Sequence, residues 1–152
     1  MSRLIGAWQL TAWRRTGSDG SVTYPLGENV RGLIVYTANG HMIVQMTTAG
    51  RAQIDSTDPL GGDPNQRAGA YSTCLAYFGT YEVSGQQVTH HIEASLFPNW
   101  SATTAVRPFE IDGDRLVLRT PPSPSGDITI VNEMSWVRSD SARADPASQG
   151  AA

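Results

Sequence analysis

Apolar and polar residues alternate along most of this chain, the pattern of β-strands that bury one face. In the first such segment, Gly6–Arg15, the alternation places Trp8 on one face and Trp13 on the other. The same pattern predicts seven further strands, at Val30–Thr37, His41–Thr48, Phe78–Val83, Val88–Phe97, Thr103–Ile111, Leu116–Thr120 and Asp127–Arg138. The chain is therefore predicted to be all-β.

Short turns between these strands indicate local connections. The Asn39-Gly40 pair suits the positive φ angles of a tight hairpin, and Ser84–Gln87 and Asp112–Asp114 are further hairpin signals. Pro121–Gly126 predicts a rigid turn before the last strand. An open sheet of this length would leave exposed edges. We therefore expect a single antiparallel up-and-down β-barrel of eight to nine strands.

Three segments depart from the strand pattern. Arg51–Pro64 is rich in Asp, Gly and Pro and is typical of a loop. Asn65–Tyr77 contains several Ala and few β-branched residues, which favours one short helix between strands. The small polar residues of Ser139–Ala152 predict a disordered tail that follows a barrel domain at residues 1–138.

Composition and charge argue against several kinds of partner. A net charge of -3 over 152 residues describes one ordinary domain, and no basic patch suggests nucleic acid. No segment approaches the run of about 20 apolar residues that crosses a bilayer, so no membrane partner is expected. Because the first residues are too few for a signal peptide before the first strand begins, we expect a cytoplasmic location.

The reactive residue types also limit the chemistry. Cys74 is the single cysteine, so it cannot form an intramolecular disulfide, and one Cys with three His at these spacings makes no zinc pattern. All eleven basic residues are arginine, which excludes Schiff-base and pyridoxal phosphate chemistry because both need a lysine amine. We expect neither a metal nor a cofactor. Arginine remains available to bind carboxylates.

A set of short motifs carries a family resemblance. They are Gly6-Ala7-Trp8, Tyr36–Met42, Tyr77–Tyr81, His90-His91 followed by Phe97–Trp100, and Arg107. In this order and spacing they resemble the bacterial and fungal lipocalin-like domain family, over roughly Leu4–Arg138. The resemblance implies a closed barrel that holds a ligand, in a group that includes both carriers and enzymes. It also implies that Trp8 lies at the closed end of the barrel, covered by Arg138.

Strand parity predicts which polar side chains face the interior. In Val88–Phe97 the set that contains His90 is otherwise apolar, so His90 should point inward and His91 outward, unless a bulge between them exchanges the two. By the same parity Arg107 points inward, and Asn132 is the odd polar member of the inward set of the last strand. These residues are the core of the candidate site.

Their spacing predicts a shared site. If the turn at Pro98–Ser101 joins its two strands symmetrically, Arg107 lies opposite Ile92 and diagonal to His90. A buried guanidinium without a partner is costly. We expect a carbonyl- or carboxylate-bearing ligand as its partner, with an ion pair to Glu82 or Glu93 as the alternative.

Two main functions follow from these residues. The first is a carrier or sensor that binds a small hydrophobic carbonyl or carboxylate compound. The second is a cofactor-free isomerase, dehydratase or cyclase with His90 or His91 as general acid or base and Arg107 as anion anchor. Further ligand-binding candidates are Asn132, Tyr36, Tyr77, Tyr81, Gln45 and Trp100. A barrel filled by its own side chains is a third possibility, and a homodimer is an additional one.

Overall fold

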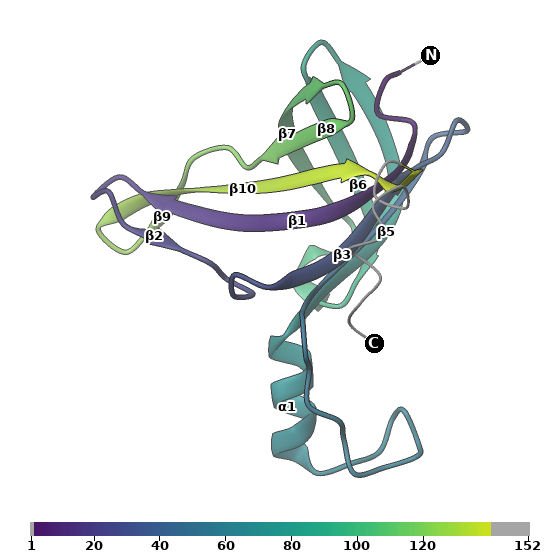
Figure 1. Cartoon of the computed structure of the whole chain (residues 1–152), viewed down its shortest axis with the longest axis vertical. Coiled ribbons are helices and arrows are strands. Elements are labelled where there is room, and N and C mark those ends of the chain that lie inside the picture. The colour runs from purple at the N-terminus through teal and green to yellow at the C-terminus, as the bar shows by residue number, and fades with distance from the viewer. Residues whose placement is uncertain (1, 141–152) are drawn as a thin grey trace.

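Eight long strands close into an antiparallel barrel in the computed structural model, which describes residues 2–140 (Figure 1). They are β1 (Gly6–Gly17), β3 (Val30–Tyr36), β4 (His41–Thr48), β5 (Cys74–Ser84), β6 (Gln87–Ser95), β7 (Thr103–Asp112), β8 (Arg115–Arg119) and β10 (Ile128–Arg138). Two short strands, β2 (Val22–Thr23) and β9 (Ser123–Ser125), pair antiparallel with β1 and β10, respectively. The predicted fold class is confirmed. The predicted tail lies, from residue 141 onward, outside the described residues.

Pairing of β1 with β10 closes the barrel. The register runs from Trp8 opposite Arg138 to Gly17 opposite Ile130, and it is interrupted by a β-bulge between Leu10 and Ala12. A bulge adds one residue to one strand, so side chains beyond it change face. Trp13 therefore joins the inner face with Trp8, and the prediction that these two residues lie on opposite faces is wrong.

The single helix, α1 (Pro64–Ser72), is shorter than the sequence predicts. It starts where the Asp63 side chain accepts hydrogen bonds from the backbone N–H groups of Asn65 and Gln66. The predicted end at Tyr77 is wrong, because Cys74–Tyr77 pair with β4 as the start of β5. This pairing overrides the helix propensity of the alanines. Figure 1 shows α1 and the loop before it projecting from one end of the barrel.

Two further predictions about the strands need correction. Pro121–Gly126 is more than a turn, since it contains β9, where Ser123 pairs with Ile130. Arg107 lies opposite Val88, not Ile92, although it remains diagonal to His90, which pairs with Ala105. The symmetric register fails because the β6–β7 ladder ends at Ile92 and Thr103, leaving a long connection that contains the 3-10 turn η1 (Pro98–Trp100).

One end of the barrel is filled by a dense apolar core. Its most deeply buried members are Leu4, Trp8, Ile34, Val88, Leu116, Leu118 and Trp136. The Arg138 guanidinium lies 4.1 Å from the centroid of the Trp8 ring and donates to the carbonyls of Arg3 (2.7 Å) and Ile5 (3.1 Å). The Trp8–Arg138 pairing that the family resemblance implies is thus confirmed, and it closes this end.

A second bulge lies between β5 and β6. Tyr77 and Phe78 pair with Ser95 and Ala94, whereas Gly79 pairs with Ile92, so Glu93 is the extra residue. It falls beyond both histidines and leaves His90 on the inner face. A Cβ on Gly79 would overlap the backbone carbonyl oxygen of His91. The close approach of β5 to β6 at this bulge therefore requires glycine.

We predict that Gly79→Ala lowers the free energy of unfolding by about 2 kcal/mol or more, because backbone must move to admit the methyl group. Urea unfolding measures the change. The control is Gly69→Ala in α1, where an added Cβ meets nothing within 4 Å. It should be neutral or stabilise by up to about 1 kcal/mol. Equal stabilities for the two variants would contradict the tight approach at Gly79.

Candidate functional site

A cavity of about 780 Å³ occupies the other half of the barrel. This volume lies in the range of small-molecule binding sites, so an interior filled by its own side chains does not describe this barrel. Tyr71 of α1 and Leu96, both more than a third exposed, are among the lining residues. The cavity therefore opens near α1, the helix that projects from one end of the barrel in Figure 1.

Most of the cavity wall is apolar and aromatic. Met46, Leu75, Ile92 and Met134 contribute aliphatic and thioether surface. The predicted site residue Trp100 also lines the cavity, with its ring edge-to-face to Phe97 (centroids 5.7 Å apart) and Tyr77 (6.0 Å). Such walls suit a flat or compact hydrophobic body.

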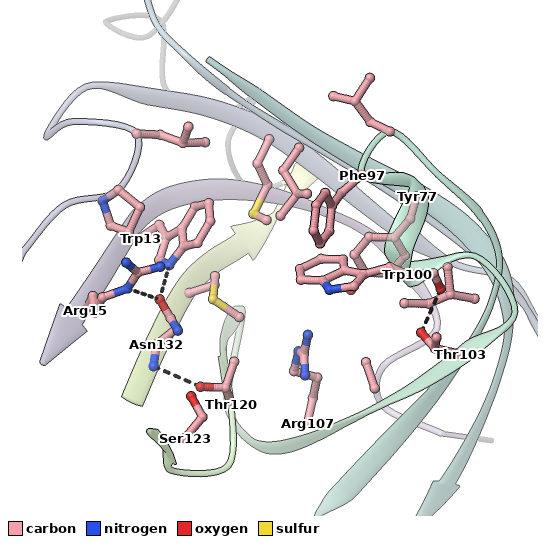
Figure 2. Close-up of a pocket in the computed structure, with 18 of the residues that line it drawn as sticks. Trp13, Arg15, Tyr77, Phe97, Trp100, Thr103, Arg107, Thr120, Ser123 and Asn132 are labelled. Carbon is pink, nitrogen blue, oxygen red and sulfur yellow. Dashed lines mark hydrogen bonds between the residues drawn. The ribbon is translucent and has the colours of Figure 1, made fainter. Parts of the chain in front are cut away.

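Arg107 projects from β7 into this cavity (Figure 2). Its Nη1 donates to the backbone carbonyl of Val106 (3.0 Å), and no carboxylate among the described residues forms a salt bridge with it. The alternative pairing with Glu82 or Glu93 does not occur. Glu82 instead lies 3.3 Å from His91 on the outer surface. The guanidinium therefore keeps N–H donors available to a ligand.

A second arginine, missed in the sequence, also lines the cavity. The bulge in β1 turns Arg15 inward together with Trp13, and Arg15 pairs across strands with Asn132. The Asn132 Oδ1 accepts hydrogen bonds from Trp13 Nε1 (2.9 Å) and Arg15 Nε (3.0 Å), as Figure 2 shows. No sequence signal marks the bulge. Strict alternation from Trp8 would place the Arg15 side chain on the outer face of the barrel.

His90 lies deep in the barrel, beneath the cavity and not among its lining residues. Its side chain is buried between two tyrosines, with Nε2 2.7 Å from the Tyr36 hydroxyl and Nδ1 2.9 Å from the Tyr77 hydroxyl. Burial, assisted by the positive charge of Arg107, lowers the pKa of His90 to about 3. The imidazole is therefore neutral at physiological pH.

The remaining predicted site residues lie away from the cavity. Tyr36 is buried against His90, and Tyr81 donates to the backbone carbonyl of Thr37 (2.8 Å). His91 and Gln45 point outward from the barrel, as parity predicts for His91. Of the predicted candidates, the structure brings together Arg107, Asn132, Trp100 and Tyr77 around one cavity, and it adds Arg15 and Trp13.

Comparisons with known proteins agree with this fold. Residues 5–139 match the family model described as a lipocalin-like domain, and the chain belongs to that family. It is 34% identical over 87 residues to the 4'-hydroxy-3'-methoxypropiophenone carrier protein ppsC of Aspergillus oryzae, a match that covers 52% of this chain and 78% of that protein.

Two solved structures are also similar. A lipocalin-like protein from Bacteroides uniformis matches with a TM-score of 0.47 at 12% identity, over 90% of this chain and 99% of the other. An uncharacterized protein from Bacteroides eggerthii matches with a TM-score of 0.45 at 10% identity, over 89% and 98% of the two chains. Among the described residues, no helix has the length and apolar character needed to cross a membrane.

The buried, neutral state of His90 predicts a pH dependence of stability. The folded-state pKa of about 3 lies below the ordinary value of 6.5, so between these values the unfolded chain binds a proton that the folded protein does not. The free energy of unfolding should therefore fall as the pH falls below about 6, by about 1.4 kcal/mol per pH unit from this residue. Urea unfolding at several pH values measures the slope.

Two neighbouring variants isolate the contribution of His90. His90→Gln should flatten the slope, whereas His91→Gln should preserve it, because His91 is half exposed on the outer surface. Parallel pH dependences for the wild type and His90→Gln would contradict the assignment.

Proposed function

We propose that this protein binds a small apolar molecule bearing a carbonyl or carboxylate group, as a carrier or sensor, with Arg107 as the anchor for that group. The observation that supports this most directly is the position of Arg107 in an apolar cavity that, among residues 2–140, no Asp or Glu lines. A guanidinium in such surroundings forms strong charge-assisted hydrogen bonds to an oxygen acceptor. A ligand oxygen would supply the charge-assisted acceptor that no described carboxylate provides to Arg107.

The Aspergillus relative supports the same kind of role. Its name describes a carrier of an aromatic ketone, 4'-hydroxy-3'-methoxypropiophenone. An aryl ketone combines a flat apolar ring with a carbonyl oxygen, the two features that the aromatic wall and Arg107 would accommodate here. We therefore include this compound as a test ligand, together with a simple aromatic carboxylate.

Binding without turnover is favoured over the cofactor-free enzyme. A general acid or base works best with a pKa near the working pH and must lie within hydrogen-bond reach of the substrate. Burial holds the pKa of His90 far below that range, and its two ring nitrogens are occupied by tyrosine hydroxyls. His91 lies on the outer surface. The cytoplasmic location and the homodimer stay predictions.

A displacement assay tests the anchor. N-phenyl-1-naphthylamine, a neutral apolar dye that fluoresces in dry surroundings, reports occupancy of the cavity, and 2-naphthoate or 4'-hydroxy-3'-methoxypropiophenone competes with it. We expect Arg107→Met to keep the dye affinity within about 2-fold and to weaken 2-naphthoate about 10-fold, since a hydrogen bond to a charged group contributes about 1.5–3 kcal/mol. Arg115→Met, on the exposed part of β8, is the matched control.

Each outcome is informative. Failure of the wild-type protein to bind the dye would mean that the cavity takes no apolar ligand, and the proposed function would be wrong. Unchanged competition by 2-naphthoate in Arg107→Met would reject Arg107 as the anchor. Circular dichroism checks that the variants keep the barrel.

A further inference from the structure

The cavity is also lined by several Ser and Thr side chains, but its two arginines lie in separate polar clusters. One consists of Arg107 and Tyr77, from β7 and β5, and the other consists of Arg15 and Asn132, from β1 and β10. Figure 2 shows the second cluster on the wall that faces Trp100 and Tyr77, with the cavity between them. The composition of each cluster determines what a ligand must present to it.

The Arg15–Asn132 cluster presents only hydrogen-bond donors. Both partners of the Asn132 amide oxygen are N–H groups, those of Trp13 and Arg15, so the oxygen must face them and the amide nitrogen is left to donate elsewhere. Arg15 uses its Nε in this contact, which leaves its terminal nitrogens to donate to a ligand. Among the described residues Arg15 forms no salt bridge.

The Tyr77 hydroxyl is also a donor, because His90 fixes its orientation. The Tyr36 hydroxyl is buried and has no hydrogen-bond partner but His90 among the described residues, so its hydrogen points to Nε2. A neutral imidazole that accepts at Nε2 carries its hydrogen on Nδ1, which then donates to the Tyr77 oxygen. The hydrogen of Tyr77 is left to point away from His90, toward the cavity that Tyr77 lines.

We infer that the ligand carries two oxygen-bearing acceptor groups at separate ends of an apolar body, one bound by Arg107 and Tyr77 and the other by Arg15 and Asn132. This inference rests on the proposed function and adds a second anchor to it. Two donor clusters, each with a permanent positive charge, are costly to leave without acceptors in an apolar cavity. A molecule with an acceptor at one end alone satisfies only one of them.

Matched aromatic acids test the second anchor by displacement of N-phenyl-1-naphthylamine. Terephthalate and 2,6-naphthalenedicarboxylate carry a carboxylate at each end of a rigid ring system, and benzoate and 2-naphthoate carry one. We expect at least one dicarboxylate to bind about 10-fold more tightly than its monocarboxylate. Arg15→Met should remove most of this gain, when each competition is evaluated with the dye affinity measured in the same variant.

The control variant is Arg14→Met. Arg14 neighbours Arg15 in β1 but is exposed on the outer face, so its loss should leave the dicarboxylate gain intact. The same gain in Arg15→Met and the wild type would overturn the inference, as would the lack of any gain with both dicarboxylates. If the second anchor fails in this way but Arg107→Met still weakens the binding of 2-naphthoate, the proposed function stands and only the second anchor is rejected. If Arg107→Met leaves the affinity for 2-naphthoate unchanged, Arg107 is also rejected as the anchor.

Discussion

The pairing of β1 with β10 is the contact on which the rest of this structure depends. It closes the sheet, which removes the exposed edges that a strand array of this length would otherwise present. The bulge within it also changes the face on which the second half of β1 points. Without that one extra residue, Arg15 would face solvent and Asn132 would lose both of its hydrogen-bond donors.

The barrel interior is divided into a solid half and a hollow half, and the buried histidine lies at the boundary. Trp8 and Trp136 fill the closed end, with Arg138 covering Trp8 from outside. Between this core and the cavity, His90 joins Tyr36 to Tyr77 through hydrogen bonds to both of its ring nitrogens, and of these three residues only Tyr77 lines the cavity. The hydrogen bond from His90 holds the Tyr77 hydroxyl in one position, which apolar packing alone would not do.

Alternation and turn signals were sufficient to predict the barrel, the inward positions of His90 and Arg107, and the place of Asn132 in the wall. They were insufficient where a single residue changes the geometry. The bulge in β1 has no residue signature, so Arg15 and Trp13 were missed. The β6–β7 register depends on how far the ladder extends before η1, and the end of α1 depends on pairing between β5 and β4. Each of these features is decided by pairing between strands, which the local pattern of residues does not determine.

The chain contains no lysine, so both cationic side chains that line the cavity in the described part of the chain, Arg15 and Arg107, are guanidinium groups. A guanidinium is planar and holds its N–H donors in fixed directions, whereas the ammonium group of a lysine rotates about its last bond. An oxygen acceptor in this cavity would therefore meet donors that lie in a plane at each arginine. The direction from which a molecule presents its oxygen, as well as its charge, would decide whether it fits.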